Sequence, residues 1–229
     1  MKIAGHAPSR SASLRPWVVC LGCGLSLFTV MGLGVNVFTV YQPHLLLVHG
    51  FTNAQGSWIT TVRSLFALLS MLTVDQLCRR LGLRNTMVLG MGCFVGSYLL
   101  FGFAHSFSAY CGGAVLSGLA YGYGGMIPLT LVISRWFPTG RGFALGMAAA
   151  GSGISTIFAP PLITGAIQAL GLSAAFLWEA AAGVLLTLLV YLLVRDSPGS
   201  PEFPDSEDSL PGARGVGLSR PLLWMVLLS

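Results

Sequence analysis

Six long runs of apolar residues follow one another along the chain, separated by short connectors. They cover residues 17–41, 57–77, 85–104, 109–136, 142–169 and 173–194. Each run is near or above the ~20 residues that a helix needs to cross a hydrocarbon core of ~30 Å. The apolar positions are continuous rather than alternating, so they predict helices and not the strands of a membrane barrel. The predicted fold class is an all-α membrane protein with six transmembrane helices.

The composition also favours a membrane protein over a soluble one. Apolar residues make up 54% of the chain and charged residues 8%, and the mean hydropathy is +0.78. Soluble domains carry about 25% charged residues. So few charges cannot cover a water-facing surface.

The basic residues lie in alternate connectors. Of the twelve Lys and Arg residues, all except Arg63 fall in the N-terminus, the second-to-third connector, the fourth-to-fifth connector or the C-terminal tail. This is the positive-inside pattern of multi-pass membrane proteins. It predicts an integral protein of the plasma (inner) membrane with both termini in the cytoplasm. Arg135 and Arg141 then hold a tight cytoplasmic turn, and a role in topology alone is sufficient to explain them.

Four regions follow from this pattern. Residues 1–15 form a cytoplasmic N-terminus, and residues 16–195 form the six-helix bundle. Residues 196–219 hold five of the seven acidic residues and four prolines, which is typical of a disordered linker. Residues 220–229 begin with Arg-Pro and continue as an apolar run too short to span a membrane, so we expect the truncated start of a seventh helix. The first apolar run is too long for the core of a cleaved signal peptide.

The sequence offers little chemistry for an enzyme. Cys20 and Cys23 have C-x-x-C spacing, but no second Cys or His pair completes a metal site, and packing is the better interpretation. Ser152 lies about 15 Å into the fifth run, far from every candidate base, which argues against a serine protease dyad. No phosphate-binding loop, zinc-protease motif or dinucleotide fingerprint is present. We therefore predict no enzymatic activity, no cofactor, no metal and no nucleic-acid partner.

Glycine recurs at G-x-x-x-G spacing in three of the predicted helices. Since apolar burial gains little in lipid, close approach across small residues is what holds such helices together. The pattern predicts tight packing, and it is also compatible with helices that slide against a partner. The pairs are Gly92/Gly96, Gly118/Gly122 and Gly142/Gly146.

Two segments carry a resemblance to a known family. V-D-Q-L-C-R-R-L-G-L-R (74–84) resembles the loop between the second and third helices of the major facilitator superfamily, with Asp75, Arg79 and Arg80 at matching positions. R-W-F-P-T-G-R-G-F-A-L-G (135–146) is similar to the fourth-to-fifth helix region of the branch that contains oxalate–formate antiporters and monocarboxylate transporters. The resemblance covers residues 16–195.

The resemblance implies an architecture and a set of roles. The chain would be the N-terminal six-helix half of such a transporter, built from 3+3 inverted repeats. Asp75 would pair with cytoplasmic arginines such as Arg141, and Arg79 and Arg80 would join the same cluster as a latch between conformations. The alternative is a static surface pair worth under about 1 kcal/mol.

Two ionisable residues lie inside the predicted spans. Arg63 is six residues into the second run, and helical spacing places it on a polar face with Thr60, Ala67 and Ser70, away from Leu65, Leu68 and Leu72. A buried arginine is costly in a membrane, and its planar fork suits a carboxylate. We predict that Arg63 binds an anionic substrate. The alternatives are snorkelling to the surface or an ion pair with Glu179 in the sixth run.

Further candidates come from the first and fourth runs, because in the family these two helices face the central cavity. They are contacts for substrate or, alternatively, packing and interfacial residues. The set is Asn36, Tyr41, Gln42, Tyr121 and Tyr123. At the outer ends of the runs, His44, His49 and His105 are predicted to be solvated.

The predicted function is secondary active transport of a small solute, with a carboxylate as the candidate class, by alternating access. One six-helix bundle supplies half of a cavity, so the lipid-embedded chain would need a second six-helix half or a second copy of itself. The alternative is a six-helix membrane fragment, or a structural or assembly protein, that does not transport.

Overall fold

The computed structural model describes residues 10–137 and 139–194, with side chains from residue 15 onward. Residues 1–9, the predicted linker (196–219) and the predicted seventh helix (220–229) lie outside the described residues. Within that range every regular element is helical. The fold class predicted from the apolar runs is therefore confirmed.

Six helical stretches of the described chain are long and apolar enough to cross a membrane. Each corresponds to one of the six predicted runs, with ends that shift by a few residues. The first differs most, because it continues eight residues past its predicted end at residue 41. The spans are Arg15–His49, Asn53–Leu81, Leu83–Phe103, Phe107–Trp136, Arg141–Leu170 and Leu172–Leu193.

The first span combines three elements. It starts as α1 (Arg10–Leu27), widens into the π-helical segment η1 (Phe28–Val37) and continues as α2 (Phe38–His49). Two glycines let neighbours approach η1 closely: the Ser155 side chain packs onto Gly32, and the Phe94 ring packs onto Gly34. Segments of π-helix often occur at functional sites.

The second and third spans are single helices. α3 (Asn53–Leu81) begins with a capping box, in which the side chains of Thr52 and Gln55 satisfy each other's backbone N–H groups. It ends at Gly82, whose φ of 85° favours glycine. α4 (Leu83–Phe103) follows at once.

The fourth span is broken, although its apolar run predicts one continuous helix. α5 (Phe107–Gly124) and α6 (Met126–Trp136) meet at Gly125, where φ is −87° and ψ is −148°. A Cβ at this position would contact the carbonyl oxygen of Tyr121. Pro128 lies in the first turn of α6, where a missing N–H is tolerated.

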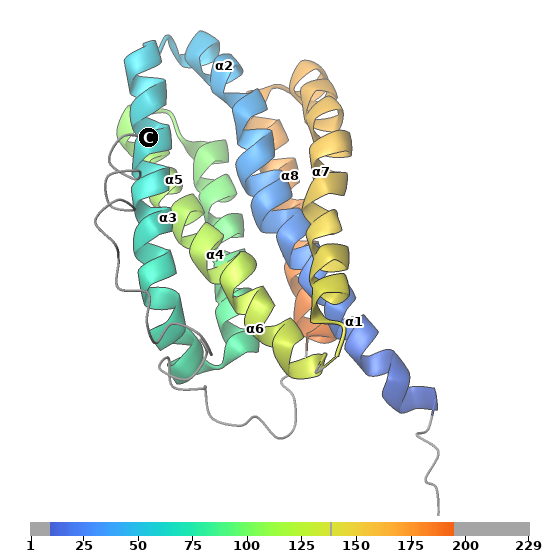
Figure 1. Ribbon diagram of the computed structural model, residues 1–229. Helices are drawn as coiled ribbons and strands as arrows, with labels where there is room; N and C mark the ends of the chain where they lie inside the picture. The colour runs from blue at the N-terminus through green and yellow to red at the C-terminus, as the bar shows by residue number, and fades with distance from the viewer. Residues whose placement is uncertain (1–9, 138, 195–229) are drawn as a thin grey trace, which may run out of the picture. The chain divides into compact units, whose positions relative to one another are not determined.

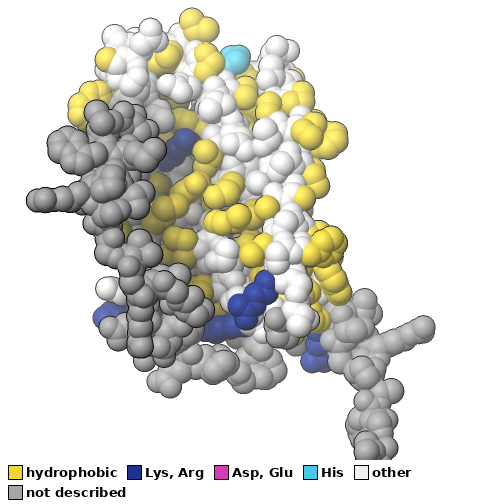
Figure 2. Space-filling view, in the orientation of Figure 1, with side chains coloured by type: hydrophobic (Ala, Val, Ile, Leu, Met, Phe, Trp, Pro, Cys, Tyr) yellow, Lys and Arg dark blue, Asp and Glu magenta, His cyan; other side chains and the backbone are white. Residues whose placement is uncertain are grey.

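The remaining spans are α7 (Arg141–Leu170) and α8 (Leu172–Leu193). In Figure 1 α5 lies between α3 and α4, and α7 lies beside the helix that carries η1, as the contacts between these elements also show. α8 packs against α4. Figure 2 shows basic side chains gathered at the end of the bundle where α3 ends and α7 begins.

Only part of the predicted glycine packing occurs. A Cβ on Gly118 would contact the backbone of Arg63, and a Cβ on Gly122 would contact Ser70, so these two glycines set the close approach of α5 to α3. By contrast, a Cβ on Gly92, Gly142 or Gly146 meets no atom within 4 Å among the described residues. The close approach at Gly118 fixes the position of α3, the helix that carries Arg63.

Candidate functional site

A cavity of about 330 Å³ lies between η1, α3 and α5. This volume falls in the range of small-molecule sites. We call it the Arg63 cavity. It is lined by Val35, Arg63, Ser64, Ala67, Leu68, Met71 and Tyr121.

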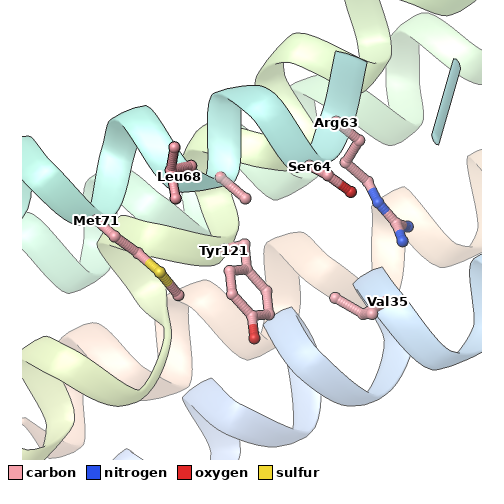
Figure 3. A pocket seen from close by; sticks show the side chains of 7 residues that line it. Val35, Arg63, Ser64, Leu68, Met71 and Tyr121 are labelled. Atoms are coloured by element: carbon pink, nitrogen blue, oxygen red, sulfur yellow. The ribbon is translucent and has the colours of Figure 1, made fainter. Parts of the chain in front are cut away.

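Arg63 extends from α3 toward η1, with the Ser64 hydroxyl beside it (Figure 3). Its Nη1 donates to the Gly34 carbonyl oxygen at 3.4 Å, and its Cζ lies 5.0 Å from the centre of the Phe38 ring. Among the described residues no carboxylate forms a salt bridge with it. Arg63 therefore keeps donors that an anionic group in the cavity could use.

A polar groove joins the Arg63 cavity at Ser64. The groove measures about 460 Å³ and runs along the first half of α3. Its lining is almost entirely hydroxyl and amide side chains, contributed by Gln42, Ser57, Thr60, Thr61 and Ser64. Gln42 and Thr60 thus line the groove and are not part of the lining of the Arg63 cavity.

The face of α3 that carries Arg63 differs in part from the predicted polar stripe. Leu68, predicted to lie elsewhere, lines the cavity, whereas Ser70 is buried and donates its hydroxyl to the Gly118 carbonyl of α5 at 3.2 Å. The stripe was therefore wrong at Leu68. The burial of Ser70 agrees with a stripe that faces protein and not lipid, since α5 packs against this side of α3.

Tyr41 and Glu179 lie together in the core. The Tyr41 hydroxyl donates to Glu179 Oε2 at 2.7 Å, and the Tyr41 ring stacks on Phe176 with centroids 4.0 Å apart. Tyr41 is fully buried and does not line the Arg63 cavity. The ion pair suggested between Glu179 and Arg63 is absent from the described residues, because Glu179 bonds to Tyr41 instead.

The other candidates from the first and fourth spans are spread over different contacts. Tyr121 lines the Arg63 cavity. Asn36 donates to the Thr156 hydroxyl of α7 at 2.7 Å, which ties η1 to the fifth span. The Tyr123 hydroxyl lies 3.0 Å from that of Thr73 on α3.

The predicted latch residues lie near the basic end of the bundle. Asp75 Oδ2 accepts from Arg79 Nε at 3.0 Å, one helical turn away on α3. Arg141 donates from Nε to the Phe137 carbonyl at 3.3 Å, and Arg80 is exposed. In this conformation the ion pair of Asp75 is with Arg79 and not with Arg141.

Two smaller expectations can be compared with the structure. His49 was expected to be solvated, but its Nε2 lies 3.0 Å from the Tyr110 hydroxyl and its ring stacks on Phe51. Cys20 donates to the Ala144 carbonyl at 3.4 Å, as a packing residue would. Within residues 10–137 and 139–194, no three His, Cys, Asp or Glu side chains gather as a metal site would require.

Sequence reasoning missed several residues of the Arg63 cavity. Ser64 and Met71 lie on α3 but outside the stripe that was predicted to share a face with Arg63. Val35 comes from the π-helical segment η1. The i, i+4, i+7 spacing of Ser64, Leu68 and Met71 is a signal that was available in the sequence. Val35 had no such signal, because a π-turn changes which side chains face inward.

Six apolar helices and a solute-sized, partly polar cavity between three of the spans are the features of a multi-pass integral membrane protein. The sequence profile of the Major Facilitator Superfamily matches residues 23–229. The chain belongs to this superfamily.

Individual relatives are more distant. The MFS-type transporter pynF of Aspergillus niger is 26% identical over 213 residues, which are 89% of this chain and 47% of that protein. An uncharacterised MFS-type transporter of Mycobacterium tuberculosis is 26% identical over 97% of this chain and 37% of its own length. The tetracenomycin C resistance and export protein of Streptomyces glaucescens is 28% identical over 89% of this chain and 37% of its own length.

The chain thus spans about half the length of these relatives, or less. The relatives are named as transporters or as an export protein, not as enzymes. Their names do not address the narrower resemblance to oxalate–formate antiporters and monocarboxylate transporters, which stays a prediction.

Proposed function

We propose that this chain forms one half of a secondary active transporter that moves a small, carboxylate-bearing solute by alternating access. Membership of the Major Facilitator Superfamily and the names of the relatives support the transporter role. A non-transporting structural or assembly role has no comparable support. The support for a carboxylate comes from the residues of the cavity.

The observation that carries the proposal is the state of Arg63. A charged arginine at the centre of a membrane helix costs roughly 2.5–3.5 kcal/mol on insertion scales, so it is a functional candidate by default. Arg63 donates one long hydrogen bond to a backbone carbonyl and has no carboxylate partner among the described residues. Its planar fork matches a carboxylate in a bidentate geometry.

The rest of the cavity suits a small organic anion. Ser64 and Tyr121 can hydrogen-bond its polar part. Val35, Leu68 and Met71 supply an apolar wall for its carbon skeleton. The polar groove that meets the cavity at Ser64 gives a hydrated path along α3, on which Gln42 would contact the solute in passing.

Three of the candidate residues have a structural role in this proposal, namely Asn36, Tyr41 and Tyr123. Each bonds to a neighbouring span: Asn36 to Thr156, Tyr41 to Glu179 and Tyr123 to Thr73. They would hold the helices that form the cavity, and contact with solute would require these bonds to open during the transport cycle.

A second bundle would complete the cavity. The apolar faces of α3 and α7 are largely unburied, with Leu65 and Leu72 on α3 and Phe143 and Ile157 on α7 each more than half exposed. Alternating access needs two bundles that rock around a midplane site. We therefore propose a second six-helix half, or a second copy of this chain, as the partner in the bilayer.

The basic end of the bundle would face the cytoplasm and would carry a latch. A single exposed pair such as Asp75–Arg79 contributes at most about 1 kcal/mol. Exchange of Asp75 between Arg79 on its own helix and Arg141 on α7, with Arg80 nearby, would give that pair a conformational role. The plasma membrane and a cytoplasmic N-terminus complete this part of the proposal.

Binding to the chain in lipid nanodiscs tests the carboxylate. Lactate and benzoate are compared with their neutral amides, lactamide and benzamide, by the shift in thermal unfolding. A ligand at 100 times its Kd stabilises the folded state by ~2.7 kcal/mol. We expect shifts with the acids only, loss of the shift in Arg63→Gln and partial retention in Arg63→Lys.

Arg15→Gln is the matched control, because it removes an exposed arginine outside the cavity. The carboxylate proposal fails if the amides stabilise as well as the acids, or if Arg63→Gln binds like the Arg15→Gln control. Counterflow of the bound acid in proteoliposomes then tests transport separately from binding. Binding without counterflow would favour the structural alternative for this chain alone.

A further inference from the structure

A second cavity shares η1 with the Arg63 cavity but has different walls. It measures about 190 Å³ and lies between η1, α7 and α8, which pack side by side (Figure 1). Its lining includes Leu33, Phe158, Leu162, Trp178, Glu179 and Leu186. We call it the Glu179 cavity. Neither its position nor its lining overlaps the carboxylate site proposed above.

Glu179 is the one acid in an otherwise apolar lining. Its side chain is 1% exposed, which is rare for a carboxyl group unless it is paired. Oε2 accepts the Tyr41 hydroxyl, but Oε1 has no hydrogen-bond partner. Among the described residues no basic side chain forms a salt bridge with it. A buried acceptor left in this state is costly and calls for a partner beyond the described residues.

The surroundings restrict that partner to a cation with an apolar body. The walls offer aliphatic and aromatic carbon, and the Trp178 ring can face a cation. A Ca²⁺ or Mg²⁺ ion needs about six oxygen ligands, far more than one carboxylate supplies. An ammonium group needs only a few acceptors, and its carbon chain can follow the apolar groove.

Depth argues for entry through the bilayer. Glu179 is seven residues beyond Leu172, the start of α8, and therefore about 10 Å along the helix axis.

The cavity volume equals that of roughly six liquid water molecules, enough for an ammonium group and its first carbons. Because Oε1 is itself buried, the Glu179 carboxyl group would have to turn toward the cavity to meet the nitrogen.

We propose that the Glu179 cavity binds the amino group of a lipid-soluble amine, with the nitrogen on Oε1 of Glu179 and the hydrocarbon between α7 and α8. The ion pair is the same by either route. An ammonium can meet the carboxylate, or a neutral amine can arrive from the lipid and take the proton of the carboxylic acid. This site is independent of the carboxylate site at Arg63.

The test uses the chain in nanodiscs of phosphatidylcholine, which contains no primary amine. The probe is 12-(dansylamino)dodecylamine, and the matched neutral probe is 12-(dansylamino)dodecanol. Energy transfer from Trp178 to the dansyl group reports binding, with Trp178→Phe as the control for the signal. We expect saturable binding of the amine at least tenfold tighter than that of the alcohol.

Glu179→Gln keeps the shape of the side chain and removes its charge, so we expect it to abolish the preference for the amine. Ala182→Phe tests the cavity separately, since it adds a ring to the wall and leaves the carboxyl group in place. We expect Ala182→Phe to weaken the binding of both probes. Arg63→Gln should bind the amine normally, so failure of this site and failure of the carboxylate site are distinguishable.

Two competitors identify the source of the amine. Displacement by phosphatidylethanolamine indicates a lipid headgroup, and displacement only by dodecylamine indicates a free amphipathic amine; either result supports the site. Equal affinities for the amine and the alcohol would overturn the proposal. So would an unchanged amine preference in folded Glu179→Gln protein.

Discussion

Tyr41 donates a hydrogen bond of 2.7 Å to Oε2 of Glu179, and this bond joins the first membrane span to the sixth inside the bundle. The Tyr41 ring also stacks on Phe176 of α8. The contact connects two spans that are far apart in the sequence, and it holds a carboxyl group that would otherwise have no partner at either oxygen.

Tyr41→Phe should therefore destabilise the protein by about 1–3 kcal/mol, the usual cost of a buried polar group that loses its partner. Unfolding in detergent, followed by helical circular dichroism, measures the loss. Tyr191→Phe is the control, because its ring is partly exposed and packs against Arg84. Combining Tyr41→Phe with Glu179→Leu should recover part of the stability, since both polar partners are then gone. Equal stability of Tyr41→Phe and the Tyr191→Phe control would contradict this interpretation.

The glycines of α5 give a second prediction. Gly118→Ala places a methyl group against the backbone of Arg63 and the Phe66 side chain of α3, so it should cost about 1–3 kcal/mol through overpacking. Gly112→Ala on the same helix meets no atom within 4 Å and should be neutral or stabilising by up to about 1 kcal/mol. Thermal unfolding of both variants in the same detergent decides between tight and loose packing of α3 on α5. A Gly118→Ala protein as stable as Gly112→Ala would show that the helices do not approach closely.

The fold was predictable from the sequence because the bilayer imposes a simple rule. A helix needs a long apolar run, and each of the six runs forms one span. Local departures from the regular α-helix were not predictable in this way. Neither the π-helical segment Phe28–Val37 nor the break at Gly125 changes the hydropathy of its span.

The site was predictable in part. Arg63 was identified from its charge inside an apolar run, and Tyr121 shares its cavity. The partner of Glu179 was not predictable, because any polar residue at a similar depth was a candidate and only the packing of α8 selects Tyr41. The inward face of α3 was likewise decided by α5, which covers Ser70 and leaves Leu68 on the cavity.

Phe38 should position Arg63 in the cavity. The guanidinium carbon lies 5.0 Å from the centre of the Phe38 ring, a geometry worth about 0.5–2 kcal/mol. Phe38→Leu should therefore weaken carboxylate binding about 2- to 30-fold, whereas Phe38→Tyr, which keeps the ring, should restore it. Titration of the ligand-induced shift in unfolding temperature measures both affinities. Equal affinities in Phe38→Leu and wild-type protein would exclude this role.

The positions of the arginines predict the labelling of single cysteines. In a background with the five native cysteines replaced by serine, Arg79→Cys and Arg141→Cys should react with an impermeant maleimide only after cells are permeabilised. Ser106→Cys, in the exposed connector between α4 and α5, should react in intact cells. Reaction of Arg79→Cys and Arg141→Cys on opposite faces of the membrane would refute the six-span topology.

The most direct measurement on the central claim is the charge selectivity of a cysteine placed beside Arg63. Ser64→Cys, in the same cysteine-free background, is treated with an anionic and a cationic methanethiosulfonate of equal size. A unit charge ~4 Å away in water changes the free energy of a charged reagent by ~1 kcal/mol, which changes its reaction rate about fivefold. Our account predicts a preference for the anionic reagent that disappears in Arg63→Gln and persists in Arg15→Gln. An unreactive Ser64→Cys, or a rate ratio that Arg63→Gln leaves unchanged, would contradict a hydrated, anion-attracting cavity at Arg63.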